Sequence, residues 1–228
     1  YGSVKSLSYE DLLRCECEII LCNAYHLMLR PGLDVISKSE GLHKFMNWEK
    51  PILTDSGGYQ VFSLGNNVKI KKDAAIFKSP YNGDEVIMTP ERSIKTQIAL
   101  GSDIMMIFDE CTPYPVTKDK ANLSMNLSLQ WAKLSKKANN SKSPLFGIVQ
   151  GGMYKDLREE SLSNLTKHDF DGYALGGLSV GEPSDIRNDI VSHIAPKMPS
   201  ESPRYLMGIG KPLDIIYAVA AGIDMFDC

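Results

Sequence analysis

The sequence is short of the features that mark membrane and secreted proteins. Its 228 residues contain no apolar run near the roughly 20 residues needed to cross a bilayer, so we predict neither a membrane span nor a secretory signal. Its five cysteines are odd in number and scattered, unlike the disulfide framework of a small secreted domain. A reducing cytoplasm is therefore the predicted location.

An excess of charge of one sign is also lacking. The chain has 25 Lys and Arg against 28 Asp and Glu, which gives a net charge of -3. Such a balance supplies no overall attraction to nucleic acid, so a contact with RNA has to come from local basic groups or from sequence outside this chain. Charge alone does not indicate an RNA-binding protein.

A convincing metal-binding spacing is absent as well. Cys15, Cys17 and Cys22 lie close together, but their spacing is irregular and Cys22 lies inside the apolar run 19–22. Because free cysteine often packs as a small hydrophobic residue, we interpret the three as ordinary thiols rather than metal ligands.

What is present is the composition of an ordinary globular protein, 43% hydrophobic and 23% charged. This length suits one domain, which we predict over 1–228. The chain opens at Tyr1 without a methionine and stops at Cys228, directly after a short apolar stretch. We interpret it as a fragment, incomplete at both ends.

Short apolar runs, often β-branched, alternate with longer stretches of helical spacing, which is the pattern of βα units around a parallel sheet. Seven such runs fit either an open doubly wound sheet or a barrel that lacks one strand. The predicted strands lie at 18–23, 51–55, 103–109, 145–150, 172–178, 204–208 and 223–227.

Helix signals lie between these runs. Thr89 and Pro90 predict a helix start and Gly101 its end, and Ser8 with Asp11 is a weaker start signal. The segment 68–88 has an Asn-Gly turn between apolar stretches and predicts an inserted β-hairpin. Two sets of apolar residues share a helix face: Leu123, Leu127, Trp131, Leu134 and Ala138, and then Ile186, Ile190 and Ile194.

Polar residues follow four of the predicted strands: Asp55, Asp109, Gln150 and Asp227. A single Asp at a strand end is more often a cap or turn residue, but in a barrel the carboxyl ends of the strands form the active-site face. We therefore expect the four side chains to converge. Carboxylates grouped in this way usually serve proton transfer, nucleophilic attack or ligand binding.

Glycine pairs accompany these sites at 57–58, 151–152 and 176–177, and they allow a flat ligand to approach the backbone, although each pair alone also suits a simple turn. Tyr59 and Met207 fit either the sandwiching of an aromatic base or core packing. The segment 208–212 opens a helix, so Gly208, Gly210 and Lys211 fit either a phosphate contact or a tight turn.

The chain resembles tRNA-guanine transglycosylases of the bacterial type along essentially its whole length. The motifs that carry the resemblance lie at 23–27, 30–32, 53–61, 90–93, 108–111, 147–151, 176–182, 205–212 and 222–228. The resemblance implies a TIM (β/α)8 barrel, of which this chain holds seven strands and lacks the first. It also implies a zinc-binding subdomain whose cysteine and histidine ligands lie downstream, so structural zinc is expected in the full-length protein and no metal ligand in this chain.

The resemblance also implies roles for particular residues. Asp227 resembles the nucleophile and Asp55 the general acid and base. The expected substrate-binding residues are Ser56, Tyr59, Asp109, Cys111, Gln150, Gly176, Gly177, Leu178, Val180 and Met207. Asp109, Gln150 and the backbone at Gly177 and Leu178 resemble the groups that read the base edge, and Tyr59 and Met207 its stacking partners.

The implied reaction exchanges guanine at the anticodon wobble position of GUN-anticodon tRNAs for preQ1, in queuosine biosynthesis. It proceeds through two displacements and a covalent ribosyl-aspartate. Val180 and Cys111 resemble the bacterial type, which favours preQ1 over queuine. The expected partners are tRNA, guanine, preQ1 and a second copy of the chain in a homodimer.

Two other hypotheses about the function stay open. One is a non-catalytic subunit of the same family, which binds tRNA or a partner; the presence of Asp55, Asp109, Gln150 and Asp227 counts against it. The other is a barrel enzyme that acts on a small phosphorylated metabolite, with 208–211 as its phosphate site.

Overall fold

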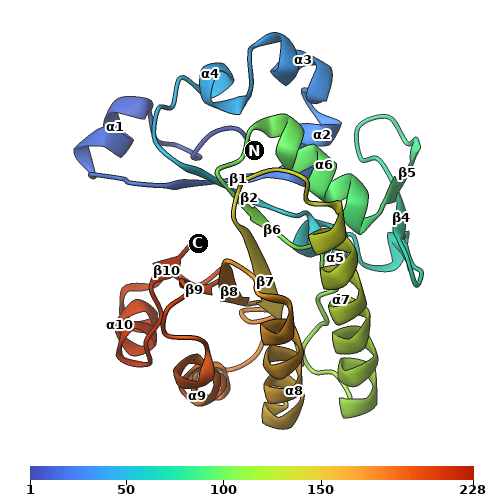
Figure 1. Cartoon of the computed structure of the whole chain (residues 1–228), viewed down its shortest axis with the longest axis vertical. Helices are drawn as coiled ribbons and strands as arrows, with labels where there is room; N and C mark the ends of the chain where they lie inside the picture. The colour runs from blue at the N-terminus through green and yellow to red at the C-terminus, as the bar shows by residue number, and fades with distance from the viewer. The chain divides into compact units, whose positions relative to one another are not determined.

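The structure is a computed structural model that describes residues 1–228, apart from the side chain of Asn66. It comprises two compact units (Figure 1), one formed by residues 1–108 and 134–144 and the other by 109–133 and 145–228. The organisation of 1–228 as a single domain stays a prediction.

The first unit is built on three parallel strands, β1 (Ile20–Asn23), β2 (Ile52–Asp55) and β6 (Ile104–Met106). Ile20 pairs with Ile52, and Leu53 pairs with Ile104. The helices of this unit are α1 (Tyr9–Arg14), α2 (Ala24–Leu29), α3 (Leu33–Lys38), α4 (Leu42–Met46), α5 (Gly58–Ser63), the short 3-10 helix η1 (Gly65–Asn67) and α6 (Pro90–Leu100). Side chains of α2 to α4 pack with those of β1 and β2 into one apolar core.

Helix α6 begins and ends where the sequence predicts. The side chain of Thr89 accepts a hydrogen bond from the N–H of Arg92, Pro90 occupies the first turn, and Gly101 ends the helix in the left-handed conformation. The weaker signal at the start of the chain is confirmed too, because Ser8 and Asp11 form a reciprocal capping box at α1.

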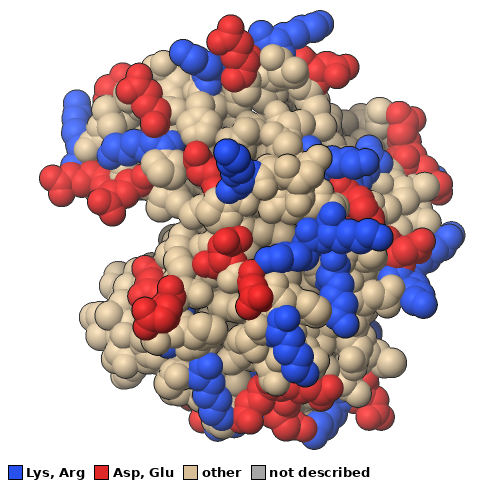
Figure 2. Space-filling model, viewed as in Figure 1, with Lys and Arg blue, Asp and Glu red and all other residues tan. Residues whose placement is uncertain are grey.

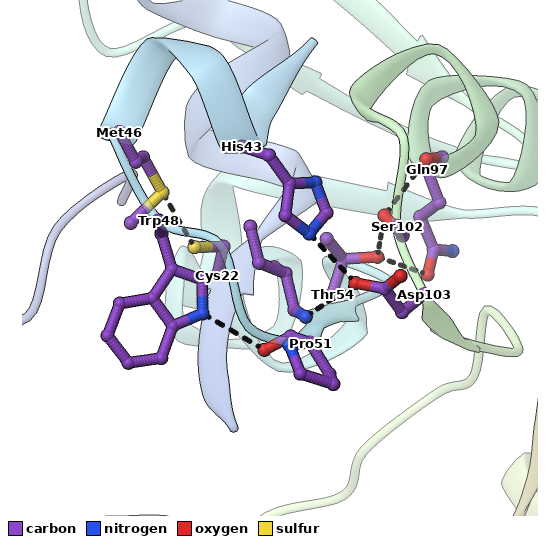
Figure 3. Close-up of polar contacts among 10 residues, drawn as sticks. Cys22, His43, Met46, Trp48, Pro51, Thr54, Gln97, Ser102 and Asp103 are labelled. Carbon is purple, nitrogen blue, oxygen red and sulfur yellow. Dashed lines mark hydrogen bonds and ion pairs between the residues drawn. The ribbon is translucent and has the colours of Figure 1, made fainter. Parts of the chain in front are cut away.

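A buried glutamine fixes α6 against the sheet (Figure 3). The Oε1 of Gln97 accepts a hydrogen bond from Thr54 Oγ1 at 2.9 Å, drawn in Figure 3. The same oxygen accepts one from the N–H of Met106, also at 2.9 Å. The Nε2 of Gln97 donates to the carbonyl of Met106, also at 2.9 Å. One fully buried side chain thereby satisfies both backbone groups of the last residue of β6.

The segment 68–88 is an insertion of antiparallel type, as predicted, but it has one strand more than a hairpin. Its strands are β3 (Val68–Ile70), β4 (Ala75–Lys78) and β5 (Glu85–Met88), and β4 pairs with both neighbours. The predicted Asn82-Gly83 turn joins β4 to β5, with the N–H of Ser79 bonded to the carbonyl of Asp84.

The second unit is built on four parallel strands, β7 (Leu145–Val149), β8 (Gly172–Leu175), β9 (Arg204–Leu206) and β10 (Met225–Phe226). Strands β7 and β8 are buried along their whole length, as expected of parallel strands with both faces covered. The helices here are α7 (Lys118–Ala138), which continues into the first unit, α8 (Lys155–Leu165), η2 (Thr166–His168), α9 (Ser184–Ile194), η3 (Ala195–Lys197) and α10 (Pro212–Ala220).

The predicted α/β class is confirmed. In the described part of the chain seven parallel strands alternate with helices, as an incomplete (β/α)8 barrel requires. The strands are shorter than predicted: β6 ends at Met106, three residues before Asp109, because the N–H of Phe108 already bonds the Ser135 hydroxyl at 3.2 Å.

The face of α7 predicted from its apolar residues is confirmed in part. Trp131 is buried and Leu127, Leu134 and Ala138 are half-buried, but Leu123 is 71% exposed. Serines share the buried face, since Ser128 accepts a hydrogen bond from the N–H of Glu110 and Ser135 accepts the one from Phe108. These hydroxyl acceptors satisfy backbone N–H groups of the loop after β6. On α9, Ile190 and Ile194 are buried as predicted.

The described surface is mixed in charge. Figure 2 shows acidic and basic side chains interspersed over the face that it draws, in agreement with the small net charge. No helix in the described part of the chain is both long and apolar enough to span a bilayer.

Candidate active site

In the second unit, parallel register brings four predicted site residues to one edge of the sheet. Val149 pairs with Leu175, Leu175 with Leu206, and Leu206 with Phe226. The residue that follows each of these in the chain is therefore at the same level, at the carboxyl end of its strand. These four residues are Gln150, Gly176, Met207 and Asp227.

A hydrogen bond joins the two side chains predicted to read a base edge. The Nε2 of Gln150 donates to Oδ2 of Asp109 at 2.7 Å, and both residues are buried. The carboxylate can only accept, so the amide nitrogen of Gln150 must face it. The backbone N–H of Gln150 bonds the Ser161 hydroxyl at 3.2 Å. The pair presents an acceptor and an amide side by side.

Gly176 and Gly177 are glycines because the side chain of Gln150 occupies the space beside them. A Cβ on Gly176 would lie 2.6 Å from Ile148 Cγ2 and 2.9 Å from Gln150 Nε2. A Cβ on Gly177 would lie 2.3 Å from Gln150 Oε1, and Gly177 has a φ of +62°. Backbone of this part of the site therefore lies directly against the Gln150 amide.

The carboxylate of Asp227 is held at one oxygen by two donors. The phenol of Tyr205 donates to Oδ1 at 2.5 Å, and the N–H of Gly208 donates to the same atom at 2.7 Å. Tyr205 is buried on β9, and Asp227 is half-buried. The two bonds fix the carboxyl plane and leave Oδ1 occupied by protein donors.

The loop after β8 is organised by Glu182, which the sequence analysis did not single out as a site residue. Its buried carboxylate accepts hydrogen bonds from the N–H of Ser179 at 2.5 Å and of Val180 at 2.8 Å. Ser179 has a positive φ of 59°. The motif that ends at this Glu was the available signal, but a Glu among Gly, Pro and Ser reads as a solvated loop residue.

Arg158 was also missed. It lies on α8 and is fully buried, and it donates to backbone carbonyls of the loops after β7 and β8. A helical Leu-Arg-Glu stretch predicts a solvated arginine, so the sequence held no signal for this burial.

Burial dominates the electrostatics of this unit. It raises the pKa of the Cys111 thiol strongly, with the nearby Asp109 adding to the shift. Burial likewise raises the pKa of Glu110, and it lowers the pKa of Arg158 to about 10. Cys111 is therefore a neutral thiol at physiological pH rather than a nucleophile.

The remaining predicted residues of this unit lie near the ends of β8 and β9. Leu178 is buried and Val180 half-buried. Met207 is half-buried and its N–H bonds the carbonyl of Leu175 at 3.2 Å. Lys211 is exposed and caps the start of α10. The N–H of Gly208 is directed to Asp227, so the phosphate contact predicted for Gly208, Gly210 and Lys211 stays a prediction.

Asp55, Ser56 and Tyr59 belong to the first unit. Asp55 ends β2 and is buried, Ser56 is fully buried, and its carbonyl accepts a 2.8 Å hydrogen bond from the Ser93 hydroxyl. Gly57 turns the chain in the left-handed conformation, and Tyr59 is 51% exposed on α5. The turn thus holds a buried carboxyl group next to an exposed aromatic ring. Convergence of Asp55 with the residues of the second unit stays a prediction.

The cysteines near the start of the chain do not fit a metal site. The thiol of Cys22 lies 3.5 Å from the sulfur of Met46 (Figure 3), and that of Cys17 points to the carbonyl of Ile19. Among the residues described, none group as three or more His, Cys, Asp or Glu able to hold a metal ion.

Comparison with known proteins agrees with the motifs. Residues 1–228 match the sequence model of the family described as Queuine tRNA-ribosyltransferase. Proteins of that name from Thioalkalivibrio sulfidiphilus, Methylobacillus flagellatus and Idiomarina loihiensis are 59%, 57% and 56% identical to this chain. Each aligns with 100% of the chain, and the chain spans 62%, 62% and 61% of their lengths.

Proposed function

The chain belongs to the queuine tRNA-ribosyltransferase family, and from this membership we propose that the whole protein is a tRNA-guanine transglycosylase, a pentosyltransferase. It exchanges guanine at the wobble position of GUN-anticodon tRNAs for preQ1, in queuosine biosynthesis. The curated relatives share the name of the family, and the chain spans about three fifths of their length.

The observation that supports this reaction best is the hydrogen bonding of Asp227. With Oδ1 accepting bonds from Tyr205 and Gly208, Oδ2 is the oxygen that attacks C1′ of the target ribose. The bond from C1′ to the guanine nitrogen breaks, and a ribosyl ester of Asp227 forms. A carboxylate suits this step because it stabilises the developing positive charge on the sugar and later departs again.

Proton traffic needs one further carboxyl group, for which we propose Asp55. In its protonated form it gives its proton to the departing guanine. The incoming preQ1 then returns a proton to it, and the preQ1 nitrogen attacks C1′ and releases the Asp227 carboxylate. A single group that cycles between both states balances the exchange.

The base is read by the pair that Gln150 forms with Asp109. Asp109 accepts N–H donors from the guanine-like edge, and the amide of Gln150 and the backbone at Gly177 and Leu178 contact the rest of the edge. The bond that holds Gln150 against Asp109 supports this arrangement, because it sets the amide before a base arrives. Bases without these groups leave buried polar atoms unpaired.

The other residues complete the pocket. Tyr59 and Met207 stack on the two faces of the base, and Ser56 and Gly176 hold the pocket wall. Val180 and the neutral thiol of Cys111 favour preQ1 over the bulkier queuine. A side chain at Lys211, with the backbone at Gly208 and Gly210, contacts a tRNA phosphate.

The remaining properties belong to the whole protein. We propose a cytoplasmic homodimer that binds tRNA together with guanine or preQ1. Structural zinc is bound by residues outside this chain, since the cysteines here do not fit a metal site. No step of the exchange depends on it.

The test is incorporation of radiolabelled guanine into unmodified tRNA by the full-length protein, with Asp227→Asn as the matched variant and preQ1 as competitor. The proposal predicts incorporation by the wild type, suppression by preQ1 and none in Asp227→Asn. A folded wild type that binds tRNA but incorporates no guanine supports instead the non-catalytic subunit.

A further inference from the structure

A buried arginine lies behind the backbone of the base pocket. Arg158 is 0% exposed, and its Nε donates to the carbonyl of Gly152 at 2.8 Å. One terminal nitrogen donates to the carbonyls of Val149 at 2.9 Å and Gly176 at 2.8 Å, and the other to that of Gly177 at 3.4 Å. The guanidinium therefore bridges the loop after β7 and the loop after β8.

Two further contacts hold the bridge formed by Arg158 in place. Gly151 has no room for a side chain, because a Cβ there would lie 2.9 Å from the backbone nitrogen of Arg158. The carbonyl of Val149 also accepts the N–H of Gly176 at 3.2 Å. The first turns of α8 are thus packed directly under the two loops.

The contacts of Arg158 also determine where the N–H groups of Gly177 and Leu178 point. In a planar trans peptide the C=O of one residue and the N–H of the next point in opposite directions. The carbonyls of Gly176 and Gly177 point to Arg158, so the N–H groups of Gly177 and Leu178 point away from it. They are directed to the side opposite α8.

The positive charge of Arg158 also strengthens these N–H groups as hydrogen-bond donors. A cation at the carbonyl end of a peptide polarises the group and makes its N–H a stronger donor, since hydrogen bonds in series reinforce one another. The pKa of Arg158 is lowered by burial only to about 10, so the side chain stays charged at neutral pH.

We infer that Arg158 is a positioning residue for base recognition, which aims the N–H groups of Gly177 and Leu178 so that the pocket selects a purine with a ring carbonyl at that edge. The inference rests on the proposed function, because it concerns how the same pocket binds its base. Arg158 itself touches backbone rather than the base. It adds a specificity determinant that Asp109 and Gln150 do not supply.

The experiment compares two probes, guanine and its diaminopurine analogue, in which an amino group replaces the ring carbonyl. Kd values for both are measured with the full-length wild type, with Arg158→Lys, and with Arg187→Lys as a matched control. Arg187 binds Asp214 at 2.6 Å. Lysine retains the charge at position 158 but cannot bridge two loops with a planar fork.

We expect the preference of the wild type for guanine over the analogue to fall by about threefold to tenfold in Arg158→Lys, the worth of one hydrogen bond, and to be unchanged in Arg187→Lys. A purely structural role lowers the fraction of folded protein, which weakens both probes equally. An unchanged preference in a folded Arg158→Lys overturns the inference.

A second measurement uses the wild type alone, in case Arg158→Lys does not fold. Hydrogen exchange of the peptide that covers 176–178 is followed with each probe. Guanine is expected to slow exchange at Gly177 and Leu178, and the analogue is not. Equal protection by both probes overturns the inference, whereas failure of the wild type to bind guanine at all defeats the proposed function itself.

Discussion

Gln150 donates a 2.7 Å hydrogen bond to Asp109 across the carboxyl ends of neighbouring segments of the second unit. Both side chains are buried, so removing one of them leaves the other with one buried hydrogen bond fewer. The pair is therefore arranged for a ligand before the ligand arrives, which reduces the cost of ordering the pocket on binding.

Replacing Gln150 by leucine tests this arrangement. The change removes the donor to Asp109 and the amide proposed to contact the base. A hydrogen bond to a charged group is worth about 1.5–3 kcal/mol, so the Kd for guanine is expected to rise roughly tenfold to a hundredfold. Asn140→Leu, at an exposed amide after α7, is the control, and equal affinities in the two variants contradict the assignment.

Gly177→Ala tests why the site needs glycine. The new Cβ would lie 2.3 Å from Gln150 Oε1, so the amide must move and its bond to Asp109 must break. Gly65→Ala is a close match, because Gly65 has a similar φ of +58° but no neighbouring atom within 4 Å of the added Cβ. Backbone strain is expected to cost each variant about 1 kcal/mol of stability, and Gly177→Ala loses the bond between Gln150 and Asp109 in addition.

Guanine binding separates the two glycine variants. Only Gly177→Ala should lose it, as measured by equilibrium binding to folded protein. Retained binding in Gly177→Ala, or an equal loss in Gly65→Ala, shows that the clash with Gln150 has no bearing on the pocket.

Tyr205→Phe tests the support of the proposed nucleophile. It deletes the donor to Asp227 Oδ1 and leaves the ring in the core. We expect kcat for guanine exchange to fall about tenfold, equivalent to about 1.4 kcal/mol, with little change in KM for the base.

The control for this variant is Tyr173→Phe, which removes a phenol from another buried tyrosine, on β8. Its kcat for guanine exchange should equal that of the wild type. If both variants lower kcat equally, Tyr205 acts through packing alone.

Sequence reasoning located the strand-end residues because parallel register carries a position from strand to strand. Gln150, Gly176, Met207 and Asp227 each follow a strand, and the structure puts them at one level. Residues that act through the backbone left no such signal. Arg158 reads as a solvated helix residue, and the serines of α7 read as its polar face, because the backbone groups that they satisfy are invisible in a sequence.

Gln97→Glu tests the stability of the first unit. A carboxylate accepts from Thr54 and from the N–H of Met106 but cannot donate to the carbonyl of Met106. The change also buries a charge. We expect the free energy of unfolding to fall by at least about 3 kcal/mol, as measured by urea denaturation of the full-length protein.

Asn140→Asp, at an exposed amide of the same unit, is the control for Gln97→Glu and should change stability by less than about 0.5 kcal/mol. If Gln97→Glu changes the free energy of unfolding by a similarly small amount, the new carboxylate beside α6 is hydrated or protonated. In that case the glutamine is not what fixes the helix to β2 and β6.

The most direct test of the account is the covalent step. Unmodified tRNA is incubated with an excess of the full-length protein, and the mixture is denatured rapidly. The protein is then digested with nuclease and protease and analysed by mass spectrometry for a ribosylated peptide. The account predicts an adduct on Asp227 that disappears when guanine or preQ1 is added before denaturation, and that Asp227→Asn does not form. An adduct on Asp55 or another residue, or exchange without any adduct, contradicts it.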